Sequence, residues 1–245
     1  MSAPMRLDKL MLARGLVETR SQAENWIRLG RVSVQGRVVT KAGHMVPSDA
    51  DVRLEAPERY VSRAGLKLAS VAGQLGMDFQ DKLVLDVGSS TGGFTDYALQ
   101  HGARRVIAVD VGTEQLHPSL RDDPRIELHE KTDIRDFMPG EQPDIVVMDV
   151  SFVSARQILP HLATIIGAAT DVLVMVKPQF EARRDQLTRG GIVKNDRHRR
   201  DILGEFEKWV RGSYVIADKA DSAVSGAGGN QERFYLLRRL KDLKN

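Results

Sequence analysis

The most informative part of this chain for its fold is residues 83–96, which read L-V-L-D-V-G-S-S-T-G-G-F-T-D. It begins with three apolar residues, as a buried parallel strand does, and Asp86 follows them. The glycines of the next turn are Gly88, Gly92 and Gly93, and a helix is predicted from about Phe94. Glycines let a backbone approach a ligand closely, and a helix N-terminus offers free N–H groups. The stretch therefore predicts a nucleotide-type site, with a tight structural turn as the alternative.

The composition is that of an ordinary soluble globular protein. The chain has 245 residues, of which 42% are hydrophobic and 28% charged, and this allows one or two domains with a sizeable core. It has no cysteine, which excludes disulfides and thiolate metal sites. There is no apolar run of membrane-spanning length and no secretory signal, so a cytoplasmic protein is expected. The histidines show no metal-ligand spacing, and we expect no metal.

Charge is unevenly distributed along the chain. Residues 1–45 hold eight basic and three acidic side chains, a net charge of +5, while the whole chain carries +3. A basic segment attached to a nearly neutral body is typical of a module that binds a polyanion. The alternative is a solvated surface on which arginine serves solubility.

The same segment has the pattern of a small α+β unit. Apolar residues from Leu7 to Met11 predict a helix that ends near Gly15. Ser21, with a glutamate three residues later, has the spacing of a capping box and is the predicted N-cap of a second helix, which ends at Gly30. Short strands are predicted at 32–34, 38–39 and 52–54.

Residues 6–41, with R-L-D-K-L, R-S-Q-A-E and I-R-L-G-R-V-S-V-Q-G, closely resemble an S4 RNA-binding domain. Members of that family bind structured RNA through backbone phosphates, with the second helix and the turn after it. The resemblance implies contacts that are electrostatic and carry little sequence information. The arginines to which we assign these contacts are Arg6, Arg14, Arg20, Arg28 and Arg31.

From residue 59 onward, strand and helix patterns alternate, as in a doubly wound α/β domain. Strands are predicted at 82–87, 105–110, 125–130, 144–149, 171–177, 213–219 and 232–239. Helices are predicted at about 60–76, 93–101, 113–120, 154–168 and 197–211. The predicted architecture is a Rossmann-like, seven-stranded, mostly parallel sheet behind a small α+β domain, with a domain of residues 1–58 and another of residues 59–245.

Charged residues stand at the carboxyl ends of the predicted strands, where ligands bind in such sheets. They are Asp86, Asp110, Asp133, Asp149 and Lys177. Asp110 could accept hydrogen bonds from both ribose hydroxyls of an adenosyl group, and Asp133 from its adenine amino group. Any one aspartate could equally be the N-cap of the following helix. Four of them at four successive strand ends favour a ligand site.

The body of the chain carries six motifs: Y-V-S-R-A-G-L-K-L, D-V-G-S-S-T-G-G-F-T, D-V-G-T-E-Q-L, M-D-V-S-F-V-S, V-K-P-Q-F-E and N-Q-E-R-F-Y-L-L. With these motifs, residues 59–245 resemble the FtsJ-type RNA ribose methyltransferase domain. Together with the S4-like segment, the chain resembles the TlyA family, which also carries the name hemolysin. The glycine spacing is not the G-x-G-x-x-G of dinucleotide-binding proteins, which disfavours an NAD-dependent reductase.

The resemblance implies a cofactor, S-adenosyl-L-methionine (SAM), and a set of site residues. The implied cofactor-binding residues are Asp86, Gly88, Ser90, Gly92, Gly93, Phe94, Asp110 and Asp133. The implied catalytic Lys-Asp-Lys-Glu set is Lys67, Asp149, Lys177 and Glu232. Without this context, a lysine on a helix such as Lys67 would be interpreted as a solvated surface charge.

The chemistry of ribose methylation fits that catalytic set. A 2′-OH is a very weak acid, so its attack on a methyl group needs a side chain that removes or polarises its proton. Lys177 can do this as a neutral amine, or as a cation that stabilises the developing alkoxide. We hypothesise that Lys177 acts on the hydroxyl and that the other three residues position it.

A further basic run follows the fifth predicted strand and could guide RNA toward Lys177; the alternative is a solvated loop and helix start. The residues of this run that we assign to RNA binding are Arg183 and Arg184. Phe180 could stack on an extruded base, or belong to the core.

The sequence therefore predicts a SAM-dependent 2′-O-methyltransferase of cytidine in ribosomal RNA, with ribosomal RNA or a ribosomal subunit as its partner. Because the S4-like segment begins within the first residues of the chain, the large-subunit RNA is the favoured target. The alternatives are a membrane-active hemolysin and a non-catalytic RNA-binding assembly factor. The oligomeric state is left open.

Overall fold

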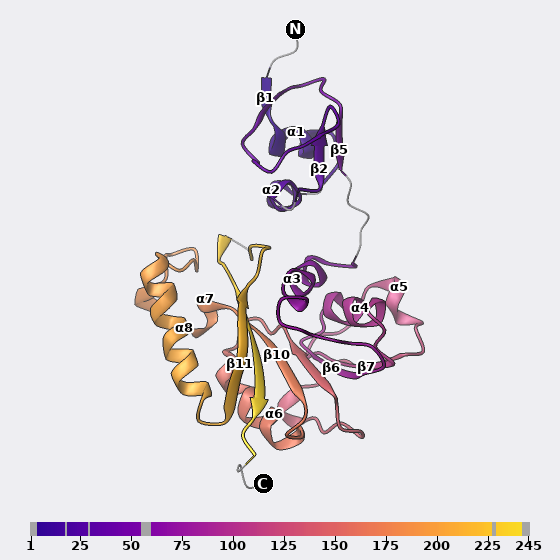
Figure 1. Cartoon of the computed structure of the whole chain (residues 1–245), viewed down its shortest axis with the longest axis vertical. Helices are drawn as coiled ribbons and strands as arrows, with labels where there is room; N and C mark the ends of the chain where they lie inside the picture. Colours follow the sequence, from indigo (N-terminus) through magenta and orange to yellow (C-terminus); the bar gives the residue numbers. More distant parts are fainter. Residues whose placement is uncertain (1–3, 18, 29, 55–59, 227–228, 242–245) are drawn as a thin grey trace. The chain divides into compact units, whose positions relative to one another are not determined.

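The chain folds into two compact units, residues 1–59 and residues 60–245 (Figure 1). The computed structural model describes residues 4–17, 19–28, 30–54, 60–226 and 229–241. Each unit has its own hydrophobic core.

The N-terminal unit is a small α+β domain. Its helices are α1 (Leu7–Ala13) and α2 (Arg20–Arg28). A three-stranded antiparallel sheet has the order β3-β2-β5, formed by β2 (Val32–Val34), β3 (Arg37–Val38) and β5 (Val52–Leu54). A second, two-stranded sheet pairs β1 (Pro4–Arg6) with β4 (Met45–Pro47). Leu7, Met11 and Ile27 from the two helices are fully buried in the core of this unit.

The structure corrects one expectation in this unit and adds one element. Helix α2 begins at Arg20, so Ser21 lies inside the helix and is not its N-cap. The hydroxyl of Thr19 accepts a hydrogen bond from the Gln22 N–H at 3.2 Å instead, because T-R-S-Q also has capping-box spacing. The pairing of β1 with β4 was not predicted, since each strand is only three residues long.

The C-terminal unit contains a seven-stranded, mostly parallel sheet, which confirms the predicted fold class. Its strands are β6 (Leu83–Val87), β7 (Arg105–Val109), β8 (Ile126–His129), β9 (Ile145–Met148), β10 (Asp171–Val176), β11 (Tyr214–Asp221) and β12 (Arg233–Arg239). Their order is β11-β12-β10-β9-β6-β7-β8, and β12 runs antiparallel to both of its neighbours. The direction in which the sheet grows reverses between β6 and β9, and ligands bind at such switch points.

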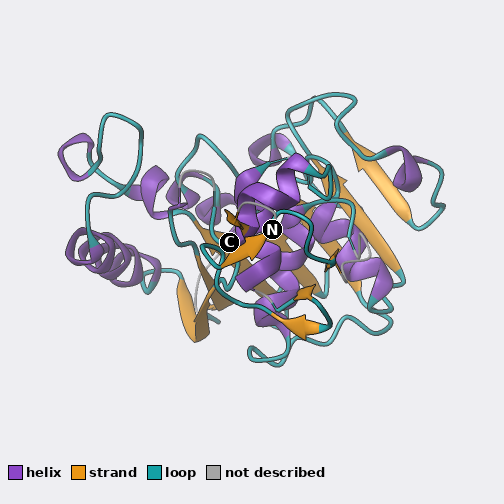
Figure 2. Ribbon diagram, turned by 90° about the horizontal axis from the view of Figure 1, so that it is seen from above, coloured by secondary structure: helices purple, strands orange, loops and turns teal. Residues whose placement is uncertain are grey.

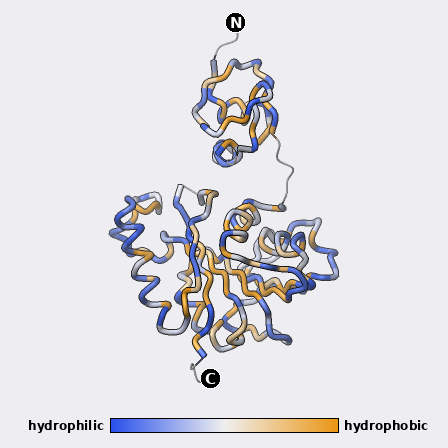
Figure 3. The backbone as a smooth tube through the Cα atoms, in the orientation of Figure 1, coloured by the Kyte–Doolittle hydropathy of each residue, from blue (hydrophilic) through white to orange (hydrophobic). Residues whose placement is uncertain are grey.

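Helices cover both faces of this sheet (Figures 1 and 2). On one face lie α3 (Arg63–Ala72) and α4 (Gly93–Gln100). On the other face lie α6 (Leu159–Ile165) and α8 (Asp196–Val210). The central strands are hydrophobic along their length because both of their faces are covered (Figure 3). The shorter helices are α5 (Pro118–Arg121), α7 (Pro178–Glu181) and the 3₁₀ turns η1 (Ile134–Asp136), η2 (Ala155–Gln157) and η3 (Arg184–Gln186).

Three predicted helices are shorter in the structure. Residues 113–117 form a loop before α5, because Arg121 donates hydrogen bonds to the carbonyls of Glu114 and Leu116 and holds them out of helical geometry. The helix predicted at 154–168 is η2 followed by α6, which has a proline in its first turn. The helix predicted at 60–76 is reduced to α3. None of the helices in the described residues is long and apolar enough to cross a membrane.

Candidate active site

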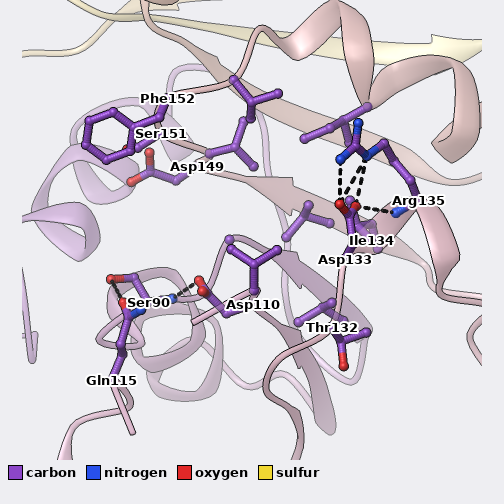
Figure 4. A pocket seen from close by; sticks show the side chains of 17 residues that line it. Ser90, Asp110, Gln115, Thr132, Asp133, Ile134, Arg135, Asp149, Ser151 and Phe152 are labelled. Carbon is purple, nitrogen blue, oxygen red and sulfur yellow. Dashed lines mark hydrogen bonds and ion pairs between the residues drawn. The ribbon is translucent and has the colours of Figure 1, made fainter. Parts of the chain in front are cut away.

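A cavity of about 480 Å³ lies at the carboxyl ends of β6, β7 and β9, where the strand order reverses (Figure 4). Gly88, Asp110 and the loop after β9 contribute to its lining. Small-molecule sites typically have volumes of about 300–1,000 Å³, so the cavity has the size of a nucleotide-type ligand site. A second cavity of about 110 Å³ shares Gly88, Ser90, Asp149 and Ser151 with the first one.

The glycine turn after β6 shapes this site. Gly88 has a φ of +79°, and a Cβ there would lie 2.9 Å from the backbone oxygen of Asp149. Gly92 has a φ of +88°, and a Cβ there would lie 2.7 Å or less from two leucine side chains. At Gly93 a Cβ would collide with Ser62. These positions therefore require glycine for their backbone conformation, for close packing, or for both.

The predicted cofactor residues divide between the two cavities. Those that line the larger cavity are Gly88, Ser90, Asp110 and Asp133, and those that line the smaller one are Asp86, Gly88, Ser90 and Phe94. Gly92 and Gly93 line neither cavity, and they act through the shape of the turn.

Asp86 is a buried carboxyl group beside the smaller cavity, and it is 1% exposed. Burial raises the pKa of Asp86 to about 7, although its Oδ2 accepts a hydrogen bond from Thr95 Oγ1 at 2.6 Å. Among the described residues, Asp86 Oδ1 and Ser89 Oγ have no hydrogen-bond partner. Both residues line the smaller cavity, and unpartnered buried oxygens there indicate a site for a polar ligand.

Asp110, at the end of β7, organises the turn that faces it. Its carboxylate accepts hydrogen bonds from the backbone N–H of Ser90 at 2.8 Å and of Gly112 at 2.7 Å. Ser90 Oγ in turn donates to Gln115 Oε1 at 3.0 Å (Figure 4). The carboxylate still borders the larger cavity, so it has acceptor capacity left for a ligand.

Asp133 lies on another side of the cavity and is paired with Arg135. The hydrogen bonds from Arg135, to both carboxylate oxygens, hold the pKa of Asp133 down at about 2. Asp133 also caps η1, because its side chain accepts from the Arg135 N–H. Asp133 therefore both caps η1 and lines the cavity.

The first of two lysine–carboxylate pairs joins β10 to β9. Lys177, directly after β10, places its Nζ 2.6 Å from Asp149 Oδ1 and donates a hydrogen bond to Ser151 Oγ at 2.6 Å. The side chains of Lys177 and Asp149 are 10% and 16% exposed, so the pair lies largely out of solvent. Asp149 and Ser151 line both cavities, which puts the Lys177 ammonium at their edge.

The second pair joins α3 to the segment before β12. Lys67 Nζ lies 2.5 Å from Glu232 Oε2, and both side chains are nearly buried. The register that aligns Val176 with Arg233 brings the next residues, Lys177 and Glu232, to adjoining positions. The structure thus brings all four members of the predicted catalytic set to one edge of the sheet. The described residues contain no group of three or more acidic or histidine side chains suited to a metal ion.

Sequence reasoning missed an aromatic residue at the mouth of the site. Phe152 is 93% exposed, has a φ of +67° and lines the larger cavity. Its ring centroid lies 5.6 Å from that of Phe180, and Lys177 Nζ lies 5.9 Å from the centroid of Phe180. The motif M-D-V-S-F-V-S contains Phe152, but no sequence pattern signals a phenylalanine that faces solvent.

The arginines assigned to RNA have different environments. Arg6 and Arg20 both pair with the buried Asp8. Burial alone would raise the pKa of Asp8, but the hydrogen bonds from these two arginines bring it to about 2. Arg14 donates to the carbonyls of Ser48 and Ala50, each at 2.6 Å.

The remaining assigned arginines are more open. Arg28 is exposed, and Arg183 forms two long ion pairs with described residues, at 3.8 Å and 3.9 Å. Arg31 and Arg184 are exposed, and no ion pair or side-chain hydrogen bond is found for either within the part of the chain that the structure describes. These last two arginines are the best placed to meet an external phosphate.

Comparison with family models matches residues 60–239 to the FtsJ-like methyltransferase domain and residues 5–52 to the S4 domain. The 16S/23S rRNA (cytidine-2′-O)-methyltransferase TlyA of Mycobacterium tuberculosis is 34% identical, over 99% of this chain and 92% of its own length. The 23S rRNA (cytidine-2′-O)-methyltransferase TlyA of Campylobacter jejuni is 37% identical, over 73% of this chain and 70% of its own length.

A solved structure from Streptococcus thermophilus, which carries a provisional hemolysin name, is 35% identical to this chain. The similarity covers 98% of this chain and 90% of that chain, with a TM-score of 0.73. The shared architecture therefore extends over both units.

Proposed function

Because the chain belongs to the FtsJ-like methyltransferase family and has an N-terminal S4 domain, we propose that it methylates the ribose 2′-OH of a cytidine in ribosomal RNA. The relatives named above carry that activity in their names. The observation that carries the proposal is the meeting of two lysine–carboxylate pairs at one edge of the sheet, where Asp149 of one pair lines a cavity of nucleotide size.

SAM is the proposed methyl donor, and the residues present fit it. Its sulfonium and ammonium groups are cationic, and the two cavities are bordered by the carboxyl groups of Asp86, Asp110 and Asp149. The unpartnered Asp86 Oδ1 is free to accept a hydrogen bond from a cationic group. When bound, SAM supplies an electrophilic methyl group. The residues proposed to hold it are Asp86, Gly88, Ser90, Phe94, Asp110 and Asp133, with Gly92 and Gly93 shaping the turn that carries several of them.

Lys177 is the residue proposed to act on the ribose. Asp149 and Ser151 hold its Nζ at the cavity edge, so a 2′-OH that enters there meets an oriented nitrogen. As the oxygen attacks, its proton passes to Lys177 if the amine is neutral. If Lys177 is a cation, it donates a hydrogen bond to the developing alkoxide, and the proton passes to water. Glu232 adjoins Lys177 through the β10–β12 register, and Lys67 is paired with Glu232. Both are proposed to hold the ribose in place.

Phe152 and Phe180 are proposed to receive the target base. These two rings are adjacent, one beside Lys177 and the other exposed to solvent, and together they form a surface on which an extruded base can stack. Arg31 and Arg184 are proposed to bind phosphates of the same RNA, because both guanidinium groups are exposed. For the substrate we propose the RNA of the large subunit, since the 23S target is common to the names of both relatives.

The test is methyl transfer from labelled SAM to ribosomal subunits that lack the modification, followed by mass mapping of the RNA. The wild-type chain should label one cytidine ribose. Lys177→Ala should lower turnover by about a hundredfold to ten-thousandfold, while the affinity for S-adenosylhomocysteine changes by no more than a few-fold. Lys208→Ala, which alters an exposed lysine on α8, is the matched control and should retain full activity.

The outcomes separate the parts of the proposal. If no ribosomal RNA is labelled, the proposed function is wrong. Label on a base instead of a ribose would contradict 2′-O chemistry. Full turnover by Lys177→Ala would remove Lys177 from its assigned role.

A further inference from the structure

Glu181 is a buried acid that the proposed mechanism does not use. It ends α7, four residues after Lys177, in the motif V-K-P-Q-F-E. Its side chain is 2% exposed, and a carboxylate is costly to bury unless donors surround it. Neither of the two cavities described above is lined by Glu181, so contact with the proposed donor does not account for its burial.

Two hydrogen-bond donors and one cation from the segment after β9 hold this carboxylate. Ser154 Oγ donates to it at 2.6 Å, and the Ala155 N–H donates at 2.7 Å. Arg156 Nε lies 3.3 Å from Glu181 Oε2. The loop begins with Asp149, so Glu181 ties the segment that follows Lys177 to the segment that carries the partner of Lys177.

The groups that would meet the substrate belong to the two segments that Glu181 joins. Asp149 and Phe152 come from the loop, and Lys177 and Phe180 come from the segment at α7. The φ of +67° at Phe152 is a conformation that costs a non-glycine residue about 1–3 kcal/mol, so neighbouring contacts must maintain it. After Phe152 the chain is held by the packing of Val153 on the core and by the hydrogen bonds of Ser154 and Ala155 with Glu181.

We propose that Glu181 is a positioning residue for methyl transfer, which holds Asp149 and Phe152 in place against Lys177 and Phe180. This inference rests on the function proposed above for the same site. The competing explanation is that Glu181 only caps η2, whose first N–H it accepts. A cap contributes to stability alone. A positioning residue also affects turnover while the affinity for the methyl donor stays the same.

Three variants probe the contact. Glu181→Ala removes the acceptor. Arg156 does not become a buried charge without a partner, because its side chain is 31% exposed and its guanidinium lies 5.7 Å from the Trp209 ring centroid. Glu181→Gln keeps one carbonyl oxygen for the Ala155 N–H. Ser154→Ala leaves Glu181 intact but removes one donor, together with the hydroxyl that accepts the Arg156 N–H.

Asp144→Ala is the matched control. The Asp144 carboxylate also accepts a hydrogen bond from a backbone N–H, that of Leu83 at 2.8 Å. It lies at the amino end of β9, whereas Asp149 lies at the carboxyl end of the same strand, beside the cavities. The control therefore removes a carboxylate that accepts a backbone N–H at the edge of the sheet away from the site.

The measurements are kcat and KM for RNA, the Kd of S-adenosylhomocysteine, the melting temperature, and amide hydrogen exchange of residues 149–156. For Glu181→Ala we expect kcat/KM to fall about tenfold or more, because small misplacements of reacting groups are costly, with the Kd within about twofold. Exchange at residues 149–156 should become faster. Glu181→Gln should recover part of the loss, and Ser154→Ala should lose several-fold. Asp144→Ala should lower the melting temperature and keep kcat/KM.

The inference is wrong if Glu181→Ala keeps wild-type kcat/KM, even if exchange at residues 149–156 becomes faster, because the loss of a cap alone would produce that result. It is also wrong if Asp144→Ala loses as much turnover as Glu181→Ala at the same loss of stability. Should Glu181→Ala fail to fold, wild-type kcat/KM in both Glu181→Gln and Ser154→Ala would overturn it. If the wild-type chain methylates no RNA, the proposed function is wrong, and this inference, which rests on it, fails with it.

Discussion

Asp86 shows how burial at a single residue can link stability to ligand binding. Its pKa of about 7 lies above the ordinary value of 3.8, so between these two pH values the folded chain holds a proton that the unfolded chain has lost. The stability contributed by the neutral carboxyl is complete below about pH 4, and it is lost as the pH rises through about 7. A bound cation would favour the ionised form instead.

Asp86→Asn should therefore stabilise the chain in a pH-dependent way. The difference in unfolding free energy between variant and wild type should be small near pH 4 and should grow to at most about 4 kcal/mol above pH 8, since one pKa unit corresponds to about 1.4 kcal/mol. Thermal unfolding of both proteins across this range measures the difference. The variant should also bind S-adenosylhomocysteine about tenfold more weakly, since it loses a charge-assisted hydrogen bond. A difference in stability that is the same at every pH would contradict the assigned cause.

The pairing of individual site residues could not be predicted from the sequence. The motifs named all four members of the Lys-Asp-Lys-Glu set, but no spacing in the sequence tells which lysine pairs with which acid. The pairing follows from the β10–β12 register and from the packing of α3, both of which are long-range. Phe152 was not predicted as a site residue for a related reason. Whether an aromatic side chain is exposed depends on which parts of the folded chain pack against it.

At the scale of elements, the strands were easier to predict than the helices. The predicted strand 82–87 differs by one residue from β6, because apolar residues end where the strand leaves the core. The predicted helix 113–120 was mostly wrong, because side-chain hydrogen bonds from Arg121 to loop carbonyls override a weak helical pattern. Ser21 failed as an N-cap because Thr19 offers the same hydroxyl two residues earlier.

The glycine turn after β6 is the element on which the site depends most. Gly88→Ala should destabilise the chain by about 1–3 kcal/mol, because a φ of +79° is strained for alanine and the new Cβ would lie 2.9 Å from the Asp149 oxygen. Since Asp149 pairs with Lys177, methyl transfer should fall as well.

Gly204→Ala is the matched control for that substitution. Gly204 lies within α8, and a Cβ there meets nothing within 4 Å. Alanine should stabilise this helix by about 1 kcal/mol and leave turnover unchanged. Chemical denaturation and single-turnover assays on both variants measure these effects. Equal stability changes in the two variants would show that the turn is not under the packing constraint described here.

At the scale of the whole molecule, positive charge is presented by both units. Arg31 belongs to the N-terminal unit and Arg184 to the C-terminal unit, and both are exposed. Arg104 is also a surface arginine of the C-terminal unit, but it pairs with Glu141 at the amino end of β7, whereas the cavities lie at the carboxyl ends of the strands. These three arginines allow a test of whether one RNA molecule engages both units.

If both units bind the same RNA, Arg31→Ala and Arg184→Ala should each weaken binding and each reduce the slope of log K against log salt concentration by about 0.7–0.9, the value expected for one lost phosphate contact. In the double variant the two slope changes should add, because distant and independent contacts are additive. Arg104→Ala should leave the slope unchanged. Filter binding or fluorescence anisotropy at several salt concentrations measures the slope. A double variant whose slope equals that of one single variant would mean that the other arginine makes no phosphate contact, and the S4 unit and the catalytic unit would then not share the RNA in the manner proposed.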